Sequence, residues 1–96
     1  MNKKELIDEI ARGTGLTRVE VGVAVDGLMA LINRTLCNGE TVELRSFGTF
    51  VPVHRAPRRA RDPVTGEIRT IPSKWTATFR PSPKLKQALN QKLKSK

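Results

Sequence analysis

Apolar and polar residues alternate with a helical period over most of the first forty positions of the chain. Asn2 and Glu5 have the spacing of a capping box, and the apolar residues of 6–11 follow at helical intervals. The glycines of 13–15 then interrupt the pattern. A short first helix is therefore predicted to begin after Asn2 and to end at this glycine pair.

A second capping box, Thr17 with Glu20, precedes a longer helical pattern that we expect to run from about Arg18 to Cys37. Its apolar residues at helical spacing are Val21, Val25, Leu28, Met29, Ile32 and Leu36. Further apolar residues make this helix hydrophobic on more than one side, which in so small a protein is typical of a helix that packs against another subunit. The residues of this helix that we expect in a dimer core are Leu28, Ile32 and Leu36.

The second half of the chain has the residue pattern of strands. Residues 41–44 alternate, 47–53 are rich in β-branched and aromatic side chains, and 76–80 return to this pattern. Gly48, which lies between bulky neighbours, indicates a tight bend or a close backbone approach. Ser82 followed by a proline predicts the start of a last helix with its own apolar stripe.

Residues 54–74 are basic, poor in large apolar side chains and interrupted by prolines. Within them, Asp62-Pro63-Val64-Thr65-Gly66 has the residue types of a tight turn. We therefore expect a long two-stranded arm with this turn at its tip, each leg of about eight residues reaching roughly 26 Å. The cations of the arm and its root are Arg55, Arg58, Arg59, Arg61, Arg69, Lys74 and Arg80.

Together these elements predict an α+β fold with two N-terminal helices, a small antiparallel sheet with a protruding β-hairpin arm, and a C-terminal helix. We expect one domain over 1–96: a helical dimerisation part at 1–40, the sheet at 41–80 with the arm at about 54–74, and a helix with a basic tail at 81–96. With 38% hydrophobic residues, three Phe, one Trp and no Tyr, the chain has little material for a core of its own. A second chain is expected to complete that core.

Composition disfavours several classes of protein. A single cysteine, Cys37, excludes an internal disulfide, and no apolar run reaches the ~20 residues of a membrane span. The N-terminus leads into no signal-peptide core. The lone His54 has no partner for metal binding or catalysis, and no carboxylates are clustered for an enzyme such as a nuclease. We expect a cytoplasmic protein that is not an enzyme, has no metal or cofactor, and does not bind membranes.

Charge is divided unequally along the chain. Residues 1–44 carry five basic and seven acidic residues, whereas 45–96 carry thirteen basic and two acidic ones, for a formal net charge of +9 overall. Segregated positive charge provides a face for a polyanion, and a guanidinium suits a narrow nucleic-acid groove. Pro63, a rigid apolar ring at the tip of a cationic arm, has a role in the turn and the shape of a wedge that could enter between base pairs.

The arm and its surroundings carry a specific set of motifs. These are Phe47-Gly48-Thr49-Phe50, Arg55, Arg58, Ala60-Arg61-Asp62-Pro63, Thr65-Gly66, Phe79-Arg80-Pro81 and Lys84-Leu85-Lys86. With both N-terminal helices, they resemble the bacterial HU/integration host factor family over essentially the whole chain. That family is itself a known example of minor-groove binding with apolar wedges, so the mechanism comes with the resemblance.

The resemblance implies an intertwined dimer whose two arms embrace duplex DNA and bend it with low sequence preference. It implies that Pro63 intercalates and that Phe47, Phe50 and Phe79 form an aromatic dimer core. The DNA-binding residues expected on these grounds are Lys3, Arg45, Arg55, Arg58, Arg59, Arg61, Pro63, Arg69, Lys74, Arg80, Lys84 and Lys86. We expect a nucleoid-associated homodimer, or a heterodimer with a paralogue, that binds bent, nicked or otherwise flexible duplex.

The sequence also departs from the family pattern. Asp62 replaces the usual asparagine, which is expected to cost affinity unless a neighbouring arginine neutralises the carboxylate, and Ala60 replaces a glycine. The return leg at 67–71 lacks the usual alternation, which leaves the inner face of the arm undefined. Trp75 either packs under the sheet or stacks at the nucleic-acid surface.

Two other functions fit the same residues. The chain resembles a subunit of a site-specific heterodimer like integration host factor at 55–58 and 78–81, which look closer to that branch than to general HU. An RNA-binding protein is the third interpretation, because a cationic arm also suits RNA.

Overall fold

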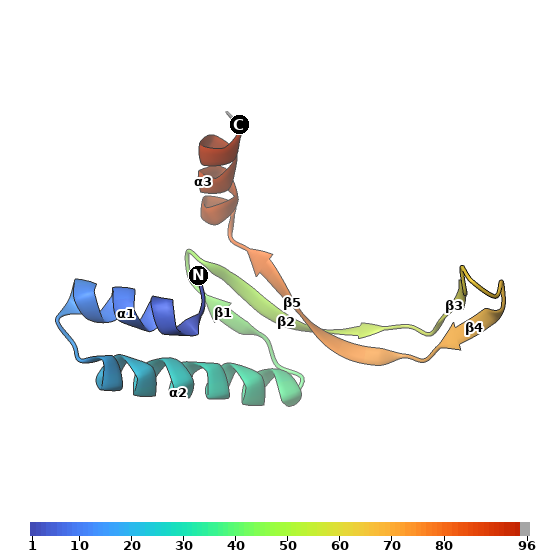
Figure 1. Cartoon of the computed structure of the whole chain (residues 1–96), viewed down its shortest axis with the longest axis horizontal. Helices are drawn as coiled ribbons and strands as arrows, with labels where there is room; N and C mark the ends of the chain where they lie inside the picture. The colour runs from blue at the N-terminus through green and yellow to red at the C-terminus, as the bar shows by residue number, and fades with distance from the viewer. Residues whose placement is uncertain (95–96) are drawn as a thin grey trace. The chain divides into compact units, whose positions relative to one another are not determined.

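Helices and strands follow the predicted order (Figure 1). The computed structural model describes residues 1–94, which contain α1 (Lys3–Thr14), α2 (Arg18–Cys37), β1 (Val42–Leu44), β2 (Gly48–Arg55), β3 (Arg58–Arg61), β4 (Ile68–Ile71), β5 (Lys74–Pro81) and α3 (Pro83–Leu93). This order confirms the α+β prediction. The last two residues of the expected basic tail, 95–96, lie outside the described residues. The chain divides into two units, Met1–Arg34 and Thr35–Lys96.

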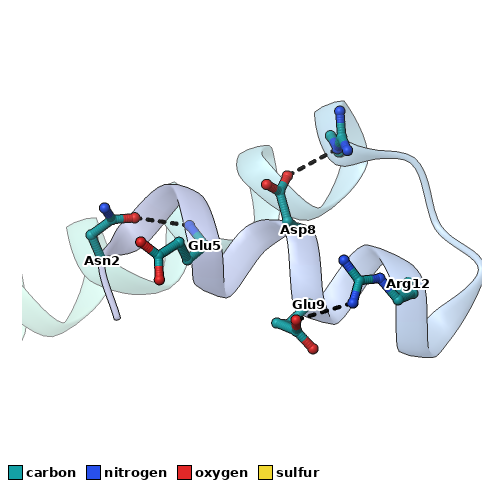
Figure 2. A network of polar contacts seen from close by, with 6 residues as sticks. Asn2, Glu5, Asp8, Glu9 and Arg12 are labelled. Atoms are coloured by element: carbon teal, nitrogen blue, oxygen red, sulfur yellow. Dashed lines mark hydrogen bonds and ion pairs between the residues drawn. The ribbon is translucent and has the colours of Figure 1, made fainter.

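Caps at both ends define α1. Asn2 Oδ1 accepts a hydrogen bond from the Glu5 backbone N–H at 2.9 Å (Figure 2). At the other end, Gly15 has a left-handed backbone with φ 78°, and its N–H donates to the Ala11 carbonyl. A non-glycine residue is strained in this conformation, so the glycine explains why the helix stops at Thr14.

A reciprocal capping box begins α2, as predicted. The Glu20 N–H donates to Thr17 Oγ1 at 3.1 Å, and the Thr17 N–H donates to a Glu20 carboxylate oxygen at 3.0 Å. The hydrogen bond that the Glu20 carboxylate accepts from the Thr17 backbone N–H, and after it one from the Thr17 side chain, lower the pKa of Glu20 because they favour its ionised form. The helix then covers the predicted range, Arg18–Cys37.

Ion pairs join α1 to α2 as an antiparallel hairpin in the first unit. Asp8 Oδ1 lies 2.9 Å from Arg18 Nε, the contact that Figure 2 shows between Asp8 and the neighbouring helix, and Lys3 Nζ pairs with Asp26. Val21, at 2% exposure, is the one buried hydrophobic side chain among residues 1–94. The hairpin therefore has very little core of its own.

Two antiparallel sheets form in the second unit. Strands in the order β1-β2-β5 make a three-stranded sheet, and β3-β4 make a two-stranded ribbon. The register of β2 with β5 pairs Phe50 with Phe79 and continues to Arg55 with Lys74, so these strands extend well beyond β1. In Figure 1, β3 and β4 follow at the far end of this extension. The long two-stranded arm is thus present.

An aromatic cluster lies on the three-stranded sheet. The ring centroid of Phe79 is 5.1 Å from that of Phe47 and 5.0 Å from that of Phe50. Gly48 is buried against it: a Cβ there would lie 2.5 Å from Phe79 Cζ and 2.6 Å from the Arg80 carbonyl oxygen. The predicted close backbone approach at Gly48 is confirmed.

The start of α3 is tied to the turn between β1 and β2. Ser82 Oγ accepts from the Leu85 N–H at 3.1 Å and donates to the Ser46 carbonyl at 3.1 Å, while Pro83 occupies the first helical turn. This confirms the predicted cap. Among residues 1–94, no helix is both long and apolar enough to cross a bilayer.

Candidate nucleic-acid interface

The ribbon of β2 and β5 has two chemically different faces. Directly paired residues of antiparallel strands point to the same face, and successive residues alternate between faces. One face carries Phe50–Phe79, Pro52–Ala77 and His54–Trp75. The opposite face, called the cationic face below, carries Thr49–Arg80, Val51–Thr78, Val53–Thr76 and Arg55–Lys74. The register therefore places the root cations on the side opposite the aromatic cluster.

The arm is interrupted once along its length. The ladder of β2 and β5 stops at Arg55 and Lys74, and the next ladder begins at Arg58. Pro57 and Pro72 lie in this interruption, one on each leg. Proline has no N–H to donate to a ladder, so a proline on each leg favours a break here, although Pro52 alone does not interrupt the ladder of β2 with β5.

Cations occupy both faces of the outer ribbon. One face carries the pairs Arg58–Ile71 and Ala60–Arg69, and the other carries Arg59–Thr70 and Arg61–Ile68. Arg58 lines a hollow of about 530 Å³ together with Arg55 and Lys74, so its face continues the cationic face of the root. Arg59 and Arg61 lie on the reverse face. The family resemblance implied that Arg58 and Arg61 line one groove, but they point to opposite sides of β3. Every cation of the arm is exposed.

The tip of the arm is a tight turn with an apolar corner. The Gly66 N–H donates to the Asp62 carbonyl at 2.8 Å, and Gly66 has φ 74°, which favours glycine. Pro63 is exposed, and the side chain next to it, Val64, is 89% exposed. The predicted turn is confirmed, and it presents two apolar side chains rather than one.

The carboxylate that departs from the family pattern has a cationic neighbour. Asp62 Oδ2 lies 3.5 Å from Arg69 Nη2. From the sequence, we expected this carboxylate to cost affinity unless an arginine lies beside it. Such an arginine is present on the opposite leg of the arm.

The remaining cations that we expect to bind DNA belong to elements other than the arm. Lys3, in the first unit, is paired with Asp26. Arg45 lines a second hollow of about 490 Å³, with residues of β1, β2 and the start of α3. Lys84 and Lys86 are exposed on α3. Their contacts with DNA stay predictions.

Trp75 lies on the face of the aromatic cluster and not on the cationic face. Its ring centroid is 5.0 Å from that of His54, at an interplanar angle of 47°, and the residue is 68% exposed. Within one chain Trp75 therefore contacts His54 but is not packed under the sheet, and its role stays a prediction.

Some residues of the candidate interface were not predicted from the sequence. Thr76 and Thr78 lie on the cationic face between Arg80 and Lys74. Simple alternation from Arg80 would have found them. Val64 had no such signal, because a valine in a turn is exposed or buried according to the packing around it.

Large apolar side chains remain uncovered on both units. Leu28 on α2 is 50% exposed and Phe47 is 48% exposed, while Ile32 and Leu36 are partly exposed. Within each unit these exposed apolar side chains are available to an interaction partner. These are the residues that the sequence assigned to a dimer core.

Comparison with known proteins gives the family. The sequence matches the family model described as bacterial DNA-binding protein over residues 1–90. DNA-binding protein HU-beta of Escherichia coli strain K12 is 40% identical over 90 residues, which are 94% of this chain and 100% of that protein. The chain belongs to the HU/integration host factor family of bacterial DNA-binding proteins. Integration host factor subunit beta of Saccharophagus degradans is 36% identical over 96 residues, covering 99% of this chain and 98% of that one.

Solved structures of family members share the fold. A cocrystal structure of Anabaena HU with DNA matches with a TM-score of 0.86 at 27% identity, covering 93% of this chain and 97% of that one. HU from Thermotoga maritima matches with a TM-score of 0.66 at 28% identity, covering 93% and 98%. The family consists of histone-like architectural DNA-binding proteins rather than enzymes.

Proposed function

We propose that this protein is a dimer that holds duplex DNA between two arms, binds in the minor groove, and bends the duplex by inserting Pro63 between base pairs. Its sequence preference is low, and it favours bent, nicked or otherwise flexible duplex. In the cell it acts in the cytoplasm as part of the nucleoid.

The tip of the arm carries this proposal. Pro63 and Val64 form an exposed apolar corner at the end of a ribbon whose cations are all exposed. Inserting an apolar wedge unstacks a base step at a cost of a few kcal/mol, which contacts between cations and phosphates must offset. In this proposal the cationic face supplies those contacts along the groove. Arg59 and Arg61, which lie on the reverse face of the outer ribbon, contact the phosphates that border the groove.

Dimerisation is supported by the uncovered apolar surface. One chain leaves Leu28, Phe47 and Phe79 substantially exposed, and Val21 is its one buried hydrophobic side chain within residues 1–94. A second copy that covers α2 and the aromatic cluster removes this surface from water, and two-fold pairing of identical chains is the commonest arrangement.

A second candidate is a subunit of a site-specific heterodimer. The 36% identity with an integration host factor beta subunit over nearly the whole chain supports it. The chain purified alone distinguishes the two functions: a homodimer with flat sequence preference supports HU-like behaviour, and a chain that needs a paralogue for stable binding supports the heterodimer.

Salt is expected to weaken DNA binding steeply. Each neutralised phosphate contributes about −0.9 to the slope of log affinity against log salt, so five or more contacts give about −4.5 or steeper. Fluorescence anisotropy of a labelled intact duplex, titrated between ~50 and ~200 mM salt, measures this slope. A slope near −1 would show that the arms do not engage the phosphates.

A further inference from the structure

Asp62 holds the turn at the arm tip together. Its Oδ1 accepts hydrogen bonds from the Val64 N–H at 2.8 Å and from the Thr65 N–H at 3.4 Å. Its backbone N–H donates to the Glu67 carbonyl at 2.8 Å, and its carbonyl accepts from the Gly66 N–H at 2.8 Å. The carboxylate side chain is only 21% exposed. One residue thus fixes the whole corner that presents the apolar wedge.

The same carboxylate engages a cation. The distance from Asp62 Oδ2 to Arg69 Nη2 is 3.5 Å, across the two legs of the arm. A guanidinium paired with a carboxylate is less available to a phosphate, and the carboxylate itself repels phosphates. Within residues 1–94, the other acid of the arm, Glu67, forms no ion pair. Of the two acids of the arm, Asp62 is therefore the one that offsets the positive charge of Arg69.

This cancellation changes what the tip can recognise. Contacts between cations and phosphates are independent of sequence and form equally on stiff and on flexible duplex. The cost of kinking, by contrast, depends on the base step and on the deformability of the duplex. A tip with little net charge therefore contributes mainly through its wedge.

We propose that Asp62 is a positioning and specificity-determining residue of the arm. It fixes the turn that presents Pro63, and it withholds Arg69 from the phosphates, so that the tip discriminates deformable or nicked duplex from intact duplex. The inference rests on the proposed function. An asparagine at this position keeps an amide oxygen for the turn but has no charge with which to hold Arg69.

The test compares Asp62→Asn with the unchanged chain on nicked and intact duplexes of one sequence. Asp62→Asn is expected to raise affinity for the intact duplex about threefold and to steepen the salt slope by about 0.9 for each arginine released. The ratio of nicked to intact affinity should fall. Glu67→Gln is the matched control, because it removes one negative charge from the same tip without releasing Arg69, and it should leave slope and ratio unchanged.

Two more variants separate charge from positioning. In an Arg69→Gln background, Asp62→Asn should no longer steepen the slope, since no cation is left to release. Asp62→Ala releases Arg69 but also loses the hydrogen bonds to the turn. It should steepen the slope as Asp62→Asn does, yet lower the yield of ligated DNA circles, whereas Asp62→Asn keeps that yield.

An unchanged salt slope in Asp62→Asn, or the same steepening in the Arg69→Gln background, would show that Asp62 does not withhold Arg69 from the phosphates. Equal yields of ligated circles for Asp62→Asn and Asp62→Ala would show that the hydrogen bonds of Asp62 do not position the turn that presents Pro63. These failures are distinct from failure of the proposed function, which would appear as a slope near −1 for the unchanged chain. Thermal unfolding without DNA checks that each variant is folded.

Discussion

Pro63→Ala is expected to reduce DNA bending far more than DNA binding. The substitution removes the rigid ring from an exposed corner and leaves every arm cation in place. Kinks made by inserted side chains range over about 20–90°, whereas the phosphate contacts supply most of the non-specific affinity. We therefore expect ligated circles to fall about tenfold for a duplex of ~100 bp, which is shorter than the ~150 bp persistence length, with a loss of affinity below about threefold.

Ligation of a linear duplex into circles, at protein concentrations matched for equal occupancy, measures this effect. Pro57→Ala is the control, because it removes a proline from the same arm but leaves the tip unchanged. Unchanged circle yield with Pro63→Ala, or an equal loss with Pro57→Ala, would remove the wedge from the mechanism.

A methyl group at Gly48 is expected to destabilise the fold strongly. The added Cβ would lie 2.5 Å from Phe79 Cζ and 2.6 Å from the backbone oxygen of Arg80, and a backbone atom cannot move aside as a flexible side chain can. Overpacking typically costs about 1–3 kcal/mol, and in a domain of this size each kcal/mol lowers Tm by about 4–8 °C. Gly48→Ala should therefore lower Tm by about 4–24 °C.

Thermal unfolding followed by circular dichroism, at one fixed chain concentration, measures this shift. Gly13→Ala is the matched control, because a Cβ there has nothing within 4 Å and lies in α1. Alanine is the better helix former by about 0.5–1 kcal/mol, so Gly13→Ala should keep or raise Tm. A Gly48→Ala chain as stable as the unchanged one would show that the cluster of Phe79 packs differently.

Local chemistry explains which elements could be predicted. Asn2, the Thr17–Glu20 pair and Ser82 form hydrogen bonds to backbone groups within three residues of themselves. Contacts this short depend on residue type and spacing alone, so the helix starts could be read directly from the sequence. The tip turn was predictable for the same reason, because the Gly66 N–H donates to the Asp62 carbonyl only four residues away. The close approach at Gly48 is to Phe79 and Arg80, far along the chain, and was indicated only by a glycine between bulky neighbours.

The faces of the arm could not be predicted because they depend on strand register. Alternation within β3 already separates Arg58 from Arg61, but only the pairing of Arg58 with Ile71 decides that Arg69 shares the side of Arg58. The ion pair of Asp62 with Arg69 likewise joins positions on opposite legs. A shift of one residue would reverse every side chain, and no local pattern fixes that choice.

The central claim is that two copies of this chain hold one duplex between their arms. Light scattering after size exclusion, with the purified chain of 10.7 kDa alone and with one equivalent of nicked duplex, tests it most directly. The account predicts twice the chain mass for the free protein and two chains on each duplex. A free protein with the mass of one chain, and a complex with one chain on each duplex, would contradict it.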